Sequence, residues 1–168
     1  MKNSNEFFLV RIIIIIAALG ICFFSAKIVG SLYYNHLISK GSAIDNFKDR
    51  YQSQIALETD PRELGKMGMI FLRTEQTDLG LACFKKASVL EPGWRDAWVW
   101  RGYAELKLNP PAGGPKEALV SLKKAEEIDP IYPLTYQLLT IAYQQTGDPD
   151  SANAAQEKLT YLSKSYQK

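Results

Sequence analysis

Histidine and cysteine are scarce in this sequence of 168 residues, which contains one histidine and two cysteines. A structural zinc site needs about four grouped ligands, and a catalytic triad needs a histidine beside its nucleophile. Cys22 lies in an apolar run, His36 follows that run, and Cys83 is distant from both in the sequence. Neither a glycine-rich phosphate loop nor a nucleophile motif is present. The sequence therefore predicts no enzyme, no metal, no cofactor and no small-molecule substrate.

A surplus of basic residues is also missing from most of the chain. The formal net charge of +2 comes from residues 1–34, whereas residues 35–168 carry 17 basic and 17 acidic side chains. Proteins that bind nucleic acids normally present a strongly basic face. We therefore expect no nucleic-acid partner. Apolar residues, in contrast, make up 46% of the chain, which is enough to form a folded core.

The sequence begins with a long apolar run. Residues 7–26 read FFLVRIIIIIAALGICFFSA and contain one charged residue, Arg11, near the start of the run. A helix of that length spans about 30 Å, which matches the hydrocarbon core of a bilayer. We expect residues 1–34 to form a short amino-terminal tail and a single transmembrane helix.

A cleaved signal peptide is the alternative for this run. Phe24 disfavours cleavage directly after the run because it takes a position that requires a small residue, although a second candidate site lies a few residues later. Lys2 and Arg11 favour a cytoplasmic tail, whereas Lys27 and Lys40 oppose it. We expect a retained signal-anchor of a single-pass membrane protein, with the following domain outside the cytoplasm.

Residues 35–60 are expected to form a linker and a capping helix. Ser42 and Asp45 have the spacing of a capping box. Apolar residues then recur at steps of three and four, at Ile44, Phe47, Tyr51 and Ile55. This helix should end before Pro61.

From residue 61 onward, one pattern recurs along the chain. The pattern recurs at two different intervals. The shorter interval separates Gly68 from Gly102, and the longer one separates FKKASVLEP at 84–92 from LKKAEEIDP at 122–130. The difference is explained by extra residues in NPPAGGP, whose prolines and glycines exclude a helix. The pattern predicts six antiparallel helices over residues 61–165. Their breaks should lie near residues 75–78, 92–95, 109–115, 130–133 and 146–149.

This pattern resembles the tetratricopeptide repeat (TPR), a helix-turn-helix unit. The matching residues are Leu64, Met67, Gly68, Phe71, Phe84, Ala87 and Pro92, then Trp98, Gly102, Ala118, Leu122, Ala125 and Pro130, then Tyr136, Leu139, Tyr143, Gly147 and Ala152. Departures from the pattern occur at Gly80, Arg101, Glu105, Thr140, Gln156 and Leu159. The resemblance implies an all-α fold, an α-solenoid of three TPR units. The TPR domain would cover residues 61–168, with repeats at 61–94, 95–132 and 133–166.

The resemblance also implies a concave groove lined by the first helix of each unit. The expected groove residues are Met69, Leu72, Arg73, Val99, Tyr103, Leu106, Lys107, Gln137, Ile141, Gln144 and Gln145. Apolar side chains with a few amide and cationic donors are suited to a peptide or helix of a partner protein. The lysine and asparagines with which some TPR domains hold chaperone tails are absent, since Gly65, Met69 and Tyr103 stand there.

Two functions fit these features. The first is a membrane-tethered TPR scaffold that helps to assemble or stabilise a membrane-associated complex through protein–protein interaction. The alternative is a permanent accessory subunit of a membrane complex, of the secretion, pilus or respiratory type.

The orientation in the membrane is testable with a single cysteine. Lys168→Cys in a Cys83→Ser background should react with a membrane-impermeant maleimide on intact cells, after permeabilisation of any outer membrane, because the domain is expected outside the cytoplasm. Labelling only after lysis of the inner membrane would reverse this orientation. A mature protein that begins near residue 27 or 31 would show a cleaved signal peptide instead.

Overall fold

A computed structural model describes residues 45–108, 110 and 112–165, and these residues contain helices and turns but no strand. The chain divides into two compact units, residues 1–47 and 48–168. The helices of the second unit are α2 (Pro61–Arg73), α3 (Thr77–Leu90), α4 (Arg95–Lys107), α5 (Pro115–Ile128), α6 (Pro133–Thr146) and α7 (Pro149–Ser165). The prediction of six helices over residues 61–165, with breaks at the stated places, is confirmed.

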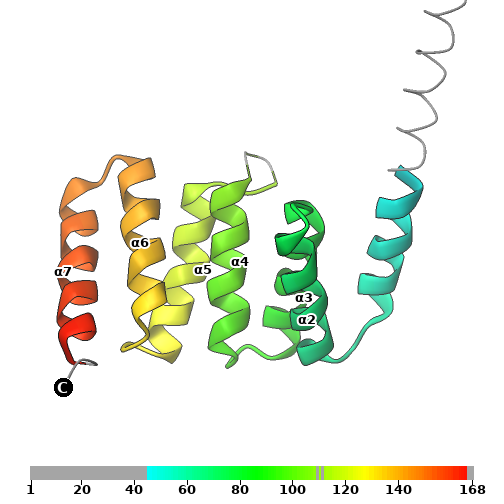
Figure 1. Cartoon of the computed structure of the whole chain (residues 1–168), viewed down its shortest axis with the longest axis horizontal. Coiled ribbons are helices and arrows are strands. Elements are labelled where there is room, and N and C mark those ends of the chain that lie inside the picture. Colours follow the sequence, from blue (N-terminus) through cyan, green and yellow to red (C-terminus); the bar gives the residue numbers. More distant parts are fainter. Residues whose placement is uncertain (1–44, 109, 111, 166–168) are drawn as a thin grey trace, which may run out of the picture. The chain divides into compact units, whose positions relative to one another are not determined.

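The six helices form three hairpins, α2/α3, α4/α5 and α6/α7, which stand in a row (Figure 1). Neighbouring hairpins pack through α3 against α4 and through α5 against α6, and α4 also contacts α6. The second unit is therefore a helical repeat in which each hairpin contacts its neighbours in the row.

No helix among the described residues is long and apolar enough to cross a bilayer. The predicted anchor, residues 1–34, and the first part of the predicted linker lie outside the described residues.

The helix boundaries follow from local sequence. The side chain of Asp60 accepts a hydrogen bond from the backbone N–H of Arg62 at 2.7 Å and so caps the start of α2. Proline, whose fixed φ suits a first helical turn, begins four of the helices, at Pro61, Pro115, Pro133 and Pro149. Gly147 ends α6 with a φ of 76°, a left-handed conformation that favours glycine.

Each of the first two hairpins is closed by a glycine that lies against a large side chain. A Cβ atom on Gly68 would lie 2.7 Å from Phe84, and one on Gly102 would lie 2.6 Å from Leu122. Both distances are too short for any real Cβ contact. The two residue pairs are therefore the same packing solution, repeated at the intervals found in the sequence.

In the third hairpin, different residues occupy the positions of this contact. Thr140 stands where the other hairpins have glycine, and its hydroxyl donates to the carbonyl of Tyr136 at 2.8 Å. Gln156 replaces the large apolar residue and is exposed. Helix α7 thus exposes a polar side chain at the position where the first two hairpins bury a large apolar one.

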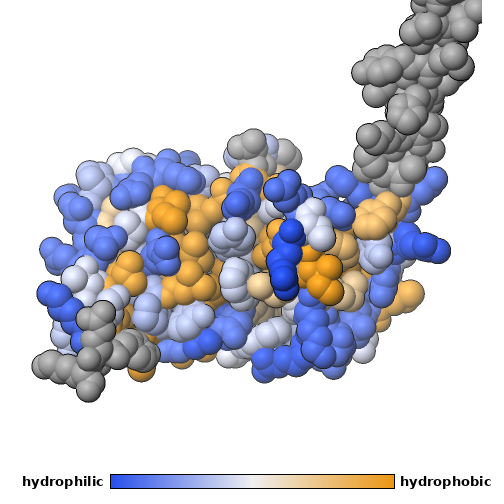
Figure 2. Space-filling model, viewed as in Figure 1, coloured by the Kyte–Doolittle hydropathy of each residue, from blue (hydrophilic) through white to orange (hydrophobic). Residues whose placement is uncertain are grey.

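Buried apolar residues form two clusters in the second unit. One is centred on α2 and α3 and includes Leu64, Phe71 and Cys83, while the other lies among α4 to α7 and includes Leu122 and Leu139. Burial raises the pKa of the Cys83 thiol to about 12, so it stays protonated at neutral pH. On the face shown in Figure 2, apolar residues gather over α2 and again over α5 and α6, among polar ones.

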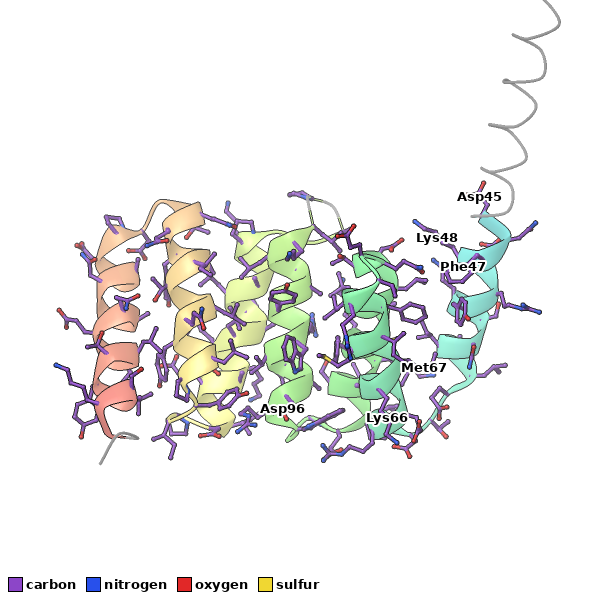
Figure 3. The ribbon with its side chains drawn as sticks, viewed as in Figure 1. Asp45, Phe47, Lys48, Lys66, Met67 and Asp96 are labelled. Atoms are coloured by element: carbon purple, nitrogen blue, oxygen red, sulfur yellow. The ribbon has the colours of Figure 1, made fainter. Side chains whose placement is uncertain are left out.

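A helical segment at residues 48–57 covers the first hairpin. The ring of Tyr51 packs edge-on against Phe71 at a centroid distance of 5.2 Å, and Ile55 is buried in the same cluster. The ammonium of Lys86 on α3 donates to the carbonyls of Ile55 and Ala56 at 2.9 and 2.5 Å. Near the other end of the segment, Lys48, labelled in Figure 3, forms an ion pair with α3. This segment shields one side of the α2/α3 hairpin from solvent.

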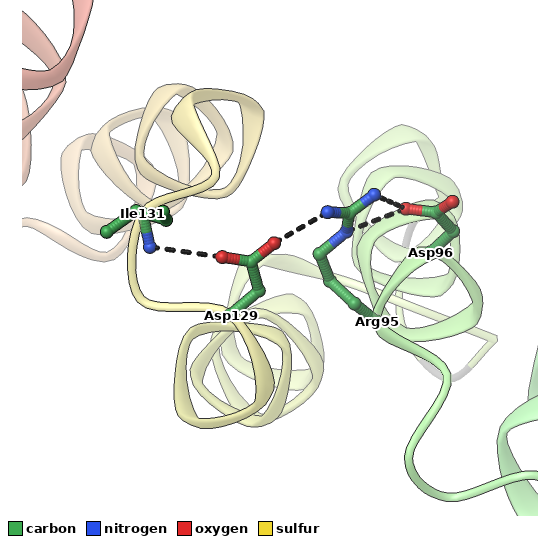
Figure 4. Close-up of polar contacts among 4 residues, drawn as sticks. All are labelled: Arg95, Asp96, Asp129 and Ile131. Carbon is green, nitrogen blue, oxygen red and sulfur yellow. Dashed lines mark hydrogen bonds and ion pairs between the residues drawn. The ribbon is translucent and has the colours of Figure 1, made fainter. Parts of the chain in front are cut away.

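An arginine clamp joins the second and third hairpins. The guanidinium of Arg95 donates to Asp96 and, at 2.6 Å, to Asp129 at the end of α5 (Figure 4). It also lies 3.7 Å from the ring centroid of Tyr132, which precedes α6. Asp129 in turn accepts a hydrogen bond from the backbone N–H of Ile131 at 3.2 Å. One side chain thus holds the end of α5 and the start of α6 to α4.

The same clamp recurs between the first and second hairpins. Arg62 donates to Glu91 at 2.7 Å and stacks over the ring of Trp94 at 4.1 Å. Glu91 and Trp94 precede their counterparts, Asp129 and Tyr132, by the longer repeat interval. We call these two sets of contacts the junction clamps.

The close approach at Gly102 generates a stability prediction. Gly102→Val should lower the free energy of unfolding by about 1–3 kcal/mol, because the added methyl groups would overlap the buried Leu122. Gly93→Val is the matched control, since a Cβ there meets nothing within 4 Å. Urea denaturation followed by circular dichroism measures both. Equal midpoints for the two variants would contradict the proposed packing.

Candidate functional site

A pocket of about 450 Å³ lies between α2 and α4. Its lining residues are Gly65, Lys66, Met69, Ile70, Arg73, Phe84, Trp94, Asp96 and Trp100. Lys66 and Asp96 lie toward the same end of their helices (Figure 3). Large apolar and aromatic side chains with a few charged groups are the usual composition of a binding pocket.

Trp94 forms part of the pocket wall because Gly65 leaves room for it. A Cβ atom on Gly65 would lie 2.4 Å from the Trp94 ring. On the same helix, the guanidinium of Arg62 holds that ring through the junction clamp. Residue 65 therefore has no room for a Cβ atom unless the Trp94 ring moves.

Trp100 extends the aromatic surface along α4. Its ring meets Tyr103 edge-on at a centroid distance of 5.7 Å, and the ammonium of Lys107 lies 5.4 Å from the Tyr103 ring. Both tryptophans are half-buried, so one side of each ring contacts the protein and the other reaches solvent. Such half-buried aromatic side chains are frequent anchors of protein interfaces.

Two rows of equivalent positions cross α2, α4 and α6. Met69, Tyr103 and Ile141 follow one another, first at the shorter and then at the longer repeat interval, and we call them the apolar row. Four residues after each lies a long side chain with hydrogen-bond donors. These three, Arg73, Lys107 and Gln145, are exposed, and we call them the donor row. Because residues four apart share a helix face, the two rows lie beside each other.

The predicted groove residues have different environments. Met69 and Arg73 line the pocket. Tyr103 and Leu106 are half-buried and pack against the core, whereas Leu72 packs against Gly80 of α3. The exposed members of the predicted set are Arg73, Lys107, Gln137, Ile141, Gln144 and Gln145.

The assignment of Val99 to the groove was wrong. Its side chain is 0% exposed and belongs to the core cluster. Val99 precedes Gly102 by three residues, so both lie on the side of α4 that is closed against α5. A partner protein has no access to it.

The departures at Arg101 and Glu105 form a polar network that sequence reasoning missed. Glu105 is 1% exposed, and it accepts hydrogen bonds from Arg101 at 3.0 Å and from Ser121 at 2.6 Å. The Arg101 guanidinium lies 5.2 Å from the Trp98 ring centroid and donates to Ser88 at 3.4 Å. The spacing of four residues between arginine and glutamate was the available signal.

A second pocket, of about 480 Å³, lies in the third hairpin at the place that corresponds to the Arg101–Glu105 network. Residues corresponding to Ser88, Trp98, Arg101, Glu105 and Ser121 all line it, namely Glu126, Tyr136, Leu139, Tyr143 and Ala155. Apolar side chains replace the ion pair here and leave space between α5, α6 and α7. Burial, followed by the nearby Glu126, raises the pKa of Tyr136 to about 12.

Within residues 45–108, 110 and 112–165, no three His, Cys, Asp or Glu side chains are grouped as a metal site requires.

Comparison with known proteins relates this chain to solved structures by fold. A crystal structure of MamA matches 67% of this chain and 64% of its own, with 22% sequence identity and a TM-score of 0.60. A second, MamA MSR-1 C2, matches 76% of this chain and 71% of its own, with 20% identity and a TM-score of 0.59. The chain thus spans less than two thirds of the first MamA chain. No family model and no curated protein matches.

These likenesses show an all-helical repeat fold, and the arrangement of the hairpins is consistent with the TPR pattern.

The contact between Gly65 and Trp94 is testable by fluorescence. Gly65→Ala should displace the Trp94 ring and lower the free energy of unfolding by about 1 kcal/mol, because the clamp with Arg62 is lost. With Trp98→Phe and Trp100→Phe in the background, acrylamide quenching then reports on Trp94 alone and should increase. Gly93→Ala serves as the control. Unchanged quenching in the Gly65 variant would mean that the ring does not rest on residue 65.

Proposed function

We propose that this protein is a membrane-tethered TPR scaffold that binds a peptide or helix of a partner protein. The binding surface is the face formed by α2, α4 and α6. The observation that carries this proposal is the pocket with two half-buried tryptophans beside the apolar row. Through this face the protein would help to assemble or stabilise a membrane-associated complex.

The energetic argument rests on aromatic anchors. A partner side chain that enters the pocket would contact Trp94, Trp100 and Met69. Contacts of this kind dominate interface energies, and truncation of one anchor commonly costs at least about 2 kcal/mol, or roughly thirtyfold in affinity. Ile70 is 60% exposed, although burial of such a side chain is favourable, so a partner that covers it would gain further stability.

Membrane tethering is proposed from the apolar run at residues 7–26. A single-pass anchor with the scaffold outside the cytoplasm would confine the binding face to the membrane surface. The partner would then be a membrane protein or a protein held at the same membrane.

The proposal is tested by removing apolar side chains from one layer of helices at a time. Ile70→Ser with Ile141→Ser alters the proposed face, and both residues are exposed, so the fold should persist. Val89→Ser with Val120→Ser is the matched control on α3 and α5, where both side chains are also exposed. Each full chain is purified from its native membrane in mild detergent, and bound proteins are quantified by mass spectrometry.

We expect the first double variant to lose at least tenfold of the bound partner and the control to retain it, because only the first lies on the binding face. Circular dichroism should show equal helical content in both. Loss of the partner in the control variant, with retention in the first, would move the binding surface to α3 and α5 and refute the proposal.

A further inference from the structure

We infer that the partner segment is an amphipathic α-helix with acidic side chains along one flank of its apolar stripe. This inference rests on the proposed scaffold function and specifies what occupies the face of α2, α4 and α6. Two observations carry it: the charges that remain unpaired on that face, and the spacing of the two rows.

Every carboxylate on α2, α4 and α6 is already paired with a cation. Glu63 pairs with Lys66 at 2.6 Å, and Asp96 pairs with Arg95 at 2.6 Å. Glu105 is buried and pairs with Arg101 at 3.0 Å, and α6 contains no charged residue at all. No carboxylate within α2, α4 or α6 therefore lacks a cation of this chain as its partner.

Two cations on the same helices have no acidic partner among the described residues. Arg73 ends α2 and Lys107 ends α4, and both side chains are exposed. They are equivalent positions, separated by the shorter repeat interval, and belong to the donor row. The row continues with Gln145 on α6, which offers an amide donor. A ligand that runs along the repeat thus meets hydrogen-bond donors on one side at each hairpin, and carboxylates are their natural partners.

A cation at the end of a helix is also favoured by the helix dipole. That effect explains how Arg73 and Lys107 could stabilise α2 and α4, but it predicts no preference among ligands. The test must therefore measure binding, and a charge change elsewhere on the surface must serve as control.

The spacing of the apolar row distinguishes a helix from an extended chain. Packed helices such as α4 and α6 lie about 8–10 Å apart, which sets the approximate step from Tyr103 to Ile141. In a ligand helix, residues seven apart are about 10.5 Å from each other and on nearly the same side. In an extended chain, residues three apart cover about 10 Å but point to opposite sides. A helix therefore places successive apolar side chains on Tyr103 and Ile141, the two members of the row whose helices contact each other.

Acidic residues that flank this stripe would reach the donor row. The two rows are four residues apart along each helix, a rise of about 6 Å, which is within the reach of arginine and lysine side chains. Each exposed ion pair contributes about 0.2–1 kcal/mol. Two such pairs change affinity by up to about thirtyfold and chiefly determine which partner is accepted.

The experiment uses two fluorescein-labelled synthetic peptides of three heptads with identical leucine stripes. One carries glutamate along one flank and the other carries lysine at the same positions. Fluorescence anisotropy measures the binding of each to the purified full chain. We expect the glutamate peptide to bind about tenfold more tightly at low salt, and this preference to shrink in 0.5 M NaCl because salt screens exposed charges.

Charge reversal identifies the residues responsible. Arg73→Glu with Lys107→Glu should invert the preference, so that the lysine peptide binds more tightly. Lys116→Glu with Lys164→Glu changes the net charge equally on α5 and α7 and should leave the preference intact. Inversion by the control variant as well would show a general charge effect and would overturn the inference.

The remaining outcomes separate this inference from the proposed function. In one outcome, both peptides bind with equal affinity to the unmodified chain and fail to bind to the Ile70→Ser, Ile141→Ser variant. That result would overturn the preference for an acidic helix and would support the scaffold function. Failure of both peptides to bind would overturn the helical occupant, while the co-purification experiment still decides the scaffold function. Binding that no variant of α2, α4 or α6 alters would overturn both.

Discussion

The contact on which the rest of this fold depends is the close approach of the two helices within a hairpin. At Gly68 and Gly102 no side chain separates the helices, and Phe84 and Leu122 lie directly on the glycine backbone. This contact fixes how α2 and α4 are rotated about their axes. The same rotation places Met69 and Tyr103, each about 100° round the helix from its glycine, at equivalent points outside the closed contact. The binding face is thus a consequence of how each hairpin is closed.

The insertion between α4 and α5 leaves this arrangement intact because Gly113, which follows it, packs against the end of α4. A Cβ atom on Gly113 would lie 2.9 Å from the carbonyl oxygen of Glu105, so only glycine allows the loop to approach so closely. The loop joins two helices whose packing is set elsewhere, by Leu122 against Gly102. Additional residues in a turn therefore lengthen the repeat interval in the sequence without changing the helix faces.

The sequence was sufficient to predict the helices, since prolines and glycines mark their ends and small residues recur in register. It was insufficient where a side chain's environment depends on another hairpin. The partner of Trp94 is Gly65 on the preceding hairpin, and Arg101, which pairs with Glu105, also donates to Ser88 on that hairpin. Val99 was misplaced because the apolar positions of α4 face two directions, the core and the exposed side. Periodicity alone does not separate these two directions.

The junction clamps also determine where the molecule opens first. The α4/α5 hairpin takes part in both clamps, whereas α6/α7 is held by one, and α7 has no described helix beyond it. Amide exchange should therefore be slowest in α4 and α5 and fastest at the carboxy-terminal hairpin. Local unfolding that begins at α7 leaves Trp94 and Trp100 in place. The surface that binds the partner would thus be kept during fluctuations that loosen the far end of the repeat.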